Sequence, residues 1–152
     1  HGTNRRQRQM CIRDRWISTN GAEGERGTLD GMDLSYHDLS GLDLSGIQMR
    51  GGKLRGAQLK ACSLILADLG GTDIFDANLC EAVIIGTNLA GANLKRCNLA
   101  NAEMGEINIV SKDGTDTGRS HRTNFHEANL VRANTQGCNL DGCVLENAIR
   151  DN

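Results

Sequence analysis

An apolar side chain recurs at every fifth residue of this chain from Leu29 to Ile109, without an exception. A fixed short period is the signature of a repeat architecture, in which each unit buries its apolar side chain by stacking on its neighbours. The period therefore limits the fold to a stack of short repeats. The seventeen members of the series are Leu29, Leu34, Leu39, Leu44, Met49, Leu54, Leu59, Leu64, Leu69, Ile74, Leu79, Ile84, Leu89, Leu94, Leu99, Met104 and Ile109, and it resumes at Phe125, Leu130, Leu140 and Leu145 with Thr135 as its one polar member.

A second series, of small residues, lies two positions before the apolar centres. A period of five fits neither the helical spacing of 3.6 nor the strand alternation of two. Residues two apart on an extended chain point the same way, so each repeat offers one large and one small inward side chain. Because glycines recur two residues after many centres, where a corner requires permissive backbone angles, we expect a narrow column with Leu59, Leu79 and Leu99 in one row. The small positions are Ala57, Cys62, Ala67, Thr72, Ala77, Ala82, Thr87, Ala92, Cys97, Ala102, Ala128, Ala133, Cys138 and Cys143.

The repeats at residues 92–96 (ANLKR) and 97–101 (CNLAN) resemble the A(D/N)LXX motif of the pentapeptide-repeat family. Seventeen repeats before the break and five after it make twenty-two, which cover about residues 27–147. The resemblance implies an all-β fold, namely a right-handed quadrilateral β-helix with four repeats in each coil, built as a single domain. Twenty-two repeats divided by four would give 5.5 coils.

The break in the period and the two ends divide the chain. We expect residues 1–15 to lie outside the native fold, because residues 9–14 (QMCIRD) look like a translated sequencing adapter. Residues 16–28 are expected to form an irregular lead-in or cap, and residues 29–109 the β-helix. The polar, glycine-containing segment 110–124 has eleven residues more than one repeat needs and is predicted to be an inserted loop. Residues 125–147 continue the β-helix, and residues 148–152 form a C-terminal end whose truncation is left open.

Charge and cysteine content narrow the functions that we expect. The formal net charge of −2 does not indicate a nucleic-acid or membrane partner. The sequence contains no stretch of about 18 apolar residues, the length that a membrane-spanning helix requires. Four of the six cysteines take small inward positions, so we expect structural thiols in a reducing, cytoplasmic compartment. We expect no cofactor and no metal site. A zinc site at His121, His126 and Cys138 is disfavoured because Cys138 should point inward while His126 points outward.

Two features of the predicted surface are candidate sites. Positions twenty residues apart share a face of the coil, so Ile65 should lie beneath Ile85, with Leu66 and Val83 beside them as an apolar interaction patch. The inserted loop is the other candidate, because long loops on rigid scaffolds often carry function. For the patch, an incidental apolar surface or cover by the N-terminal segment around Trp16 and Ile17 is left open; for the loop, a tolerated insertion without function is left open. The candidate loop residues are Lys112, Asp113, Asp116, Arg119, His121 and Arg122.

No nucleophile with its base, no phosphate-binding glycine loop and no paired carboxylates emerge from the sequence, so we do not expect an enzyme. We predict instead a non-catalytic scaffold that binds an unknown protein partner, with a homodimer left open and no nucleic-acid partner expected. One alternative comes from family members that mimic DNA to bind DNA gyrase or topoisomerase, as in quinolone resistance. That function requires a continuous acidic surface, whereas residues 29–109 carry six basic residues against ten acidic ones. A second alternative is the repeat tail of a ubiquitin-ligase substrate adaptor with a potassium-channel-tetramerisation domain.

Overall fold

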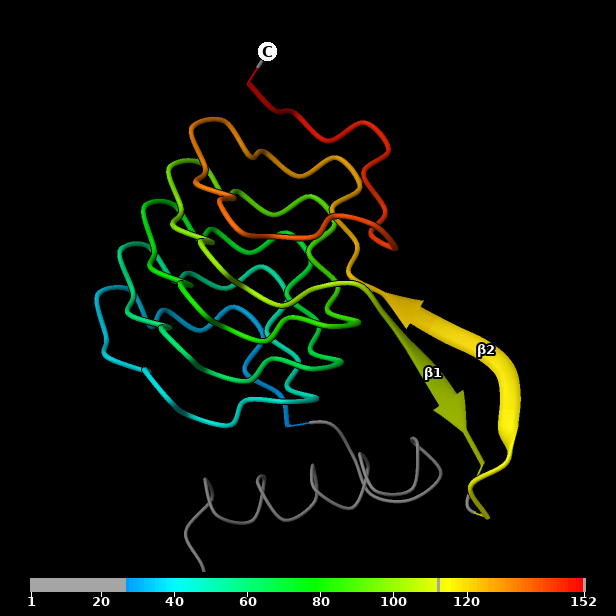
Figure 1. Ribbon diagram of the computed structural model, residues 1–152. Coiled ribbons are helices and arrows are strands. Elements are labelled where there is room, and N and C mark those ends of the chain that lie inside the picture. The colour runs from blue at the N-terminus through cyan, green and yellow to red at the C-terminus, as the bar shows by residue number, and fades with distance from the viewer. Residues whose placement is uncertain (1–26, 112, 152) are drawn as a thin grey trace, which may run out of the picture.

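The backbone winds into a coil whose turns are stacked on one another (Figure 1). The computed structural model describes residues 27–111 and 113–151. Each bridge in the coil is parallel, and except where the insertion intervenes it joins a residue to the one twenty positions later, as Asp33 joins Lys53 and Lys53 joins Asp73. The bridging residue recurs every five residues, directly before each apolar centre, so four bridges fall in each twenty-residue turn. The expected stack of β-structure is confirmed, and the described residues include no helix.

A left-handed residue lies two positions after each apolar centre from Leu29 to Leu99 and turns the chain. Fifteen such residues, every fifth one from Gly31 to Asn101, have positive φ. At one corner the amide of Cys97 donates to the carbonyl of Leu94 at 3.1 Å, across Arg96 with a φ of 62°. This is the four-residue turn that usually takes Gly or Asn as its third residue. Seven of the fifteen corners are not Gly, at a cost of about 1 kcal/mol each that the bridges between coils offset.

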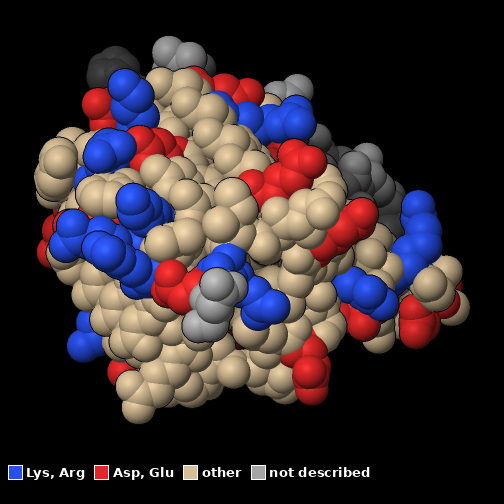
Figure 2. Space-filling model, turned by 90° about the horizontal axis from the view of Figure 1, so that it is seen from above, with Lys and Arg blue, Asp and Glu red and all other residues tan. Residues whose placement is uncertain are grey.

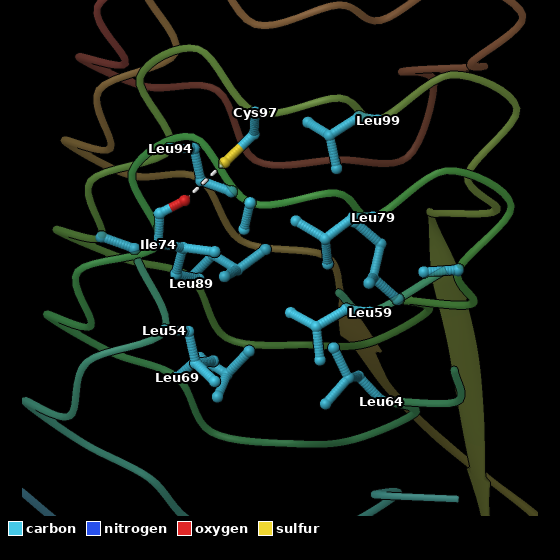
Figure 3. Close-up of a cluster of buried hydrophobic side chains, with 14 of the residues drawn as sticks. Leu54, Leu59, Leu64, Leu69, Ile74, Leu79, Leu89, Leu94, Cys97 and Leu99 are labelled. Carbon is cyan, nitrogen blue, oxygen red and sulfur yellow. Dashed lines mark hydrogen bonds between the residues drawn. The ribbon is translucent and has the colours of Figure 1, made fainter. Parts of the chain in front are cut away.

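The apolar centres form a buried column inside the coil (Figure 3). Leu59, Leu79 and Leu99 lie one above another on successive turns, and their side chains are 0%, 1% and 0% exposed. Leucine, isoleucine and a single aromatic ring, that of Phe125, fill this narrow interior, which explains how a chain with 3% aromatic residues buries a core. The predicted row is therefore confirmed.

The small inward residues do more than leave room for the column. The hydroxyl of Thr72 donates to the carbonyl of Met49 at 2.7 Å, and the thiol of Cys97 donates to the carbonyl of Ile74 at 2.7 Å. In both pairs the donor lies twenty-three positions after the acceptor, so the bond joins one turn to the turn below. These polar side chains are buried without an unpaired donor, because the column carbonyls accept from them.

Two antiparallel strands interrupt the coil and form a hairpin at its side (Figure 1). Strand β1 spans Glu106–Val110 and strand β2 spans Asp116–Arg122. Ile107 pairs with His121 and Ile109 pairs with Arg119, with an irregularity between Ile109 and Val110. Because side chains alternate along a strand, Ile107 and Ile109 share one face of the hairpin with His121 and Arg119.

This hairpin corrects the predicted boundaries of the insertion. Asn88 pairs with Asn124, thirty-six positions later, so 36 − 20 = 16 residues are extra rather than eleven. Ile109 is half-buried in β1 and does not belong to the column, where Phe125 takes the next place above Leu89. The prediction failed because Ile109 lies five residues after Met104, so the apolar alternation of β1 coincided with the repeat period.

Thr135, the polar member of the apolar series, lies beside a hollow in the upper part of the coil. The hollow has a volume of about 330 Å³, and Leu99, Phe125, Leu130 and Leu140 are among its lining residues. A leucine at this step would extend into the space that the shorter threonine side chain leaves. The column is therefore tightly filled in its middle turns and less so above Leu99.

Candidate functional site

The hairpin lies against one corner of the coil. A Cβ atom added to Gly86 would lie 2.7 Å from Cγ2 of Ile107, 3.1 Å from Cδ2 of Leu66 and 3.4 Å from Cβ of His121. Gly86 also has a φ of 68°, so the corner needs a glycine for its conformation and for this close approach. The apolar face of the hairpin is thereby held on the coil at Leu66 and Gly86.

The four patch residues lie on adjacent turns, as expected from the twenty-residue spacing. The amide of Leu66 donates to the carbonyl of Ile85 at 3.1 Å, and Val83 forms a bridge with Ser63 on the turn below. However, Ile65, Leu66, Val83 and Ile85 are all half-buried instead of freely exposed. Leu66 belongs to the surface on which Ile107 packs, so part of the expected open patch is the seat of the hairpin.

The acidic residues of the insertion shape its tip. Lys112 lies outside the described residues. The carboxylate of Asp113 accepts hydrogen bonds from the hydroxyl of Ser111 and from the amide of Thr115, the latter at 2.9 Å. These bonds, that from Ser111 first, lower the pKa of Asp113 to about 2. Asp116 accepts from the amide of Gly118 at 2.8 Å, so both aspartates stabilise turns.

The basic residues of the insertion lie on the two faces of β2. Arg119 and His121 share the face that packs toward the coil, whereas Arg122 lies on the outer face with Ser120. There the hydroxyl of Ser120 donates to the carboxylate of Glu106, and Nε of Arg122 lies 4.0 Å from the same carboxylate oxygen. All residues of β2 are exposed. The structure thus brings three of the predicted basic residues together on one exposed strand.

A groove runs between β2 and the coil. It has a volume of about 590 Å³. One wall consists of Ser120, His121 and Arg122 from β2, and no residue of β1 contributes to it. The groove therefore lies on the side of β2 that faces away from β1. The sequence does not reveal this groove, because the five-residue period predicts a loop at the insertion and not two paired strands. The wall on the coil consists of Leu66, Ala67, Asp68, Gly86, Asn88, Ala90, Asn124 and Val144.

Arginines close to Phe75 and on the neighbouring turn lie against acidic side chains. Arg55 Nη1 lies 2.7 Å from Oδ2 of Asp73, and its guanidinium lies 4.6 Å from the ring centroid of Phe75. Nε of Arg50 lies 3.3 Å from Oδ2 of Asp68. Figure 2 shows basic and acidic side chains interspersed on the upper face of the molecule. Neither sign of charge dominates this surface.

Residues 27–111 and 113–151 do not meet the requirements of a metal site or of a membrane-spanning helix. No three His, Cys, Asp or Glu side chains of this part gather closely enough to hold a metal ion. The ring of His126 instead contacts the carbonyl of Glu146 at 3.1 Å, and the thiol of Cys138 donates to the carbonyl of Leu99 at 2.9 Å. In the same part of the chain, no helix has the length and apolarity required to cross a membrane.

The family model of pentapeptide repeats matches the chain in eight copies, over residues 43–79, 72–109 and 121–149. No curated protein matches the chain. Among solved structures, the pentapeptide repeat protein Rfr23 from the cyanobacterium Cyanothece 51142 is 24% identical, covering 82% of this chain and 84% of that chain, with a TM-score of 0.49. A pentapeptide repeat protein of the Arabidopsis thaliana thylakoid lumen is 26% identical, covering 70% of this chain and 63% of that chain, with a TM-score of 0.36. QnrB1, a plasmid-mediated fluoroquinolone resistance protein, is 16% identical, covering 84% of this chain and 66% of that chain, with a TM-score of 0.35.

Proposed function

Because this chain belongs to the pentapeptide-repeat family, we propose that it is a non-catalytic scaffold that binds another protein through its hairpin. The close approach of Ile107 to Gly86 carries this proposal, since it fixes the hairpin on the coil. A two-stranded hairpin is only marginally stable alone, whereas one seated on a rigid coil can present a defined surface. The partner-binding surface comprises β2 and the groove beside it.

The interior of the coil supports a scaffold rather than a catalyst. Leu59, Leu79 and Leu99 fill the middle turns and are at most 1% exposed. Substrate sites in enzymes are usually concave pockets in which polar groups converge. In the groove beside β2, the side chains of Ser120 and His121 lie on opposite faces of the strand, and the hydroxyl of Ser120 donates to Glu106 and not to the imidazole.

The proposal includes the shape and surroundings of the coil. We take it to be right-handed and four-sided, as in the family; four bridges in each twenty-residue turn support the four sides. We place it in a reducing, intracellular compartment, which the buried thiols of Cys62 and Cys97 support. DNA mimicry is not part of the proposal, because Asp68 and Asp73 lie against arginines instead of forming a continuous acidic surface.

A variant without the hairpin tests this function. Removing residues 107–122 takes out sixteen residues, and the added change Glu106→Gly supplies a glycine at the new corner. Met104 and Phe125 then become adjacent centres of a regular repeat, with Thr123 in the small inward position. Thr123 already donates to the carbonyl of Ile84 at 2.7 Å, as the small inward residues do elsewhere.

We expect this variant to keep the circular dichroism and cooperative unfolding of the full chain. Immobilised full chain should capture a partner from cells of its source organism, and the variant should lose that partner. A matched control, Lys60→Ala, changes an exposed charge away from the groove and should capture the partner unchanged. Equal capture by the folded variant and the full chain would overturn the assignment of binding to the hairpin.

A further inference from the structure

We propose that the free edge of β2 binds an extended partner segment as a third strand, and that this segment alternates apolar and acidic residues. The inference rests on the proposed function and specifies the chemistry of the partner. In such β-strand addition, backbone hydrogen bonds supply affinity, and pockets for alternate side chains supply specificity.

The hydrogen bonding at the base of the hairpin determines which backbone groups of β2 are free. The amide of Thr123 donates to the carbonyl of Gly105 at 2.9 Å, so these two residues face each other as a hydrogen-bonded pair. Bonded and non-bonded pairs alternate along antiparallel strands. The pair of Ile107 and His121 is then bonded, whereas Ser120 and Arg122 direct their amides and carbonyls away from β1.

The groove lies at this edge of β2. Ser120, His121 and Arg122 line it, and the opposite wall belongs to the coil. Three strand residues extend over about 10 Å, which is enough to pair with roughly four residues of a bound segment. The groove therefore lies where a short third strand would pair with β2, and three strand residues border it. An exposed strand edge is a ready template for such pairing.

The two faces of the groove differ in chemistry. The coil side offers the apolar side chains of Leu66, Ala90 and Val144, which would contact alternate residues of the segment, beside the polar side chains of Asp68, Asn88 and Asn124. The outer face offers Arg122, whose side chain is 54% exposed. Its Nε lies 4.0 Å from the carboxylate of Glu106, which is at the outer limit of an ion pair. A carboxylate on the outer face of the segment could therefore pair with this guanidinium.

The charges around the groove favour an acidic segment over a basic one. Strand β2 carries Arg119, His121 and Arg122, against one acidic residue, Asp116, which is already bonded to the amide of Gly118. Asp68 in the coil wall is engaged by Arg50 at 3.3 Å and by the side-chain amide of Asn88 at 3.0 Å. A lysine of an incoming segment would find no carboxylate on this strand that is not already bonded.

The test uses the full chain and a defined peptide, acetyl-Thr-Val-Glu-Val-Glu-Val-Thr-amide, labelled for fluorescence anisotropy. Two matched peptides replace both Glu by Lys or carry N-methyl groups on alternate amides. We expect the acidic peptide to bind and to slow hydrogen exchange at the amides of Ser120 and Arg122. Both matched peptides should bind at least about tenfold more weakly, the loss expected for one hydrogen bond or charge pair.

Substitutions on the two edges of the hairpin form a matched pair. Ser120→Pro removes an amide from the groove edge, whereas Asn108→Pro removes one from the opposite edge of the same cross-strand pair. We expect about tenfold weaker peptide binding for Ser120→Pro and no change for Asn108→Pro. Arg122→Glu leaves the backbone intact and should weaken binding of the acidic peptide while strengthening that of the lysine peptide.

The outcomes separate this inference from the proposed function. Equal binding of all three peptides, or of Ser120→Pro and Asn108→Pro variants that keep the contact of Ile107 with Gly86, would overturn the third-strand inference. Partner capture that still requires the hairpin would leave the proposed function standing in that case. Capture that survives removal of the hairpin would overturn both.

Discussion

The thiol of Cys97 donates a hydrogen bond to the carbonyl oxygen of Ile74, at 2.7 Å and one turn below it in the coil. The same carbonyl accepts the amide of Ala77 at 3.2 Å. Burial raises the pKa of Cys97, as it raises that of Cys62, from 9.0 to about 12. These cysteines are packed in the column, so the ionisation of their thiols is linked to the stability of the coil.

Stability should fall in alkaline solution because of these two thiols. A raised pKa in the folded state means that their contribution is complete below about pH 9 and is lost as the pH rises toward 12. We expect the melting temperature to drop more between about pH 8 and about pH 10.5 in the full chain than in a Cys62→Ala, Cys97→Ala variant. Equal drops in the two proteins would contradict the linkage.

Gly86 and Gly71 provide a test of the hairpin contact. Both have positive φ, at 68° and 64°, but a Cβ at Gly71 would meet no atom within 4 Å. Gly71→Ala should therefore cost only the corner strain, about 1 kcal/mol. Gly86→Ala should cost about 1 kcal/mol more, because Ile107 must move. Urea unfolding measures the difference, and faster hydrogen exchange in β1 and β2 should accompany Gly86→Ala alone.

Acid should loosen the tip of the hairpin before the coil unfolds. The carboxylate of Asp113 has a pKa of about 2, lowered first by its bond from Ser111. A lowered pKa means that the ionised group stabilises the tip above about pH 4 and that this contribution is lost as the pH falls through 2. The amide resonance of Thr115 should follow this titration. In an Asp113→Asn variant it should be independent of pH over the same range.

Thr135→Leu should stabilise the upper coil. The hollow of about 330 Å³ beside Thr135 is lined by Leu99, Phe125 and Leu130 on its apolar side and by Arg150 and Asp151 on its polar side, so the larger side chain would add contacts to the apolar side. We expect a gain of about 1 kcal/mol in the free energy of unfolding. Thr135→Val, which keeps the volume of threonine, should gain less. A loss of stability in the leucine variant would show that this space is required by the backbone around it.

The sequence predicted the coil because the residues that define each repeat lie within five positions of one another. The spacing of Leu59, Leu79 and Leu99 was enough to place them in one row, and the small residue two positions earlier was enough to indicate an extended chain. Corners such as Leu66 and Arg96 were harder to recognise, since a left-handed residue that is not Gly leaves no mark in composition. They are imposed by the bridges on either side.

The hairpin could be predicted only as a break. Its pairing of Ile107 with His121 joins residues fourteen positions apart, and nothing in the five-residue period indicates that partner. Ile109 even continued the period by coincidence, which hid the point at which the chain leaves the coil. The groove beside β2 depends on how the hairpin folds back on Leu66, a long-range contact that local pattern does not encode.

Gly105 and Thr123 are joined by a hydrogen bond at the point where the chain departs and returns. The turns above and below therefore stack on a closed turn of the coil, whatever the length of the segment inserted between Gly105 and Thr123. Amino-acid substitutions in the inserted segment can therefore accumulate without disturbing the stacked turns. The same junction offers engineers a position at which foreign ribbons could be grafted and displayed at a fixed orientation.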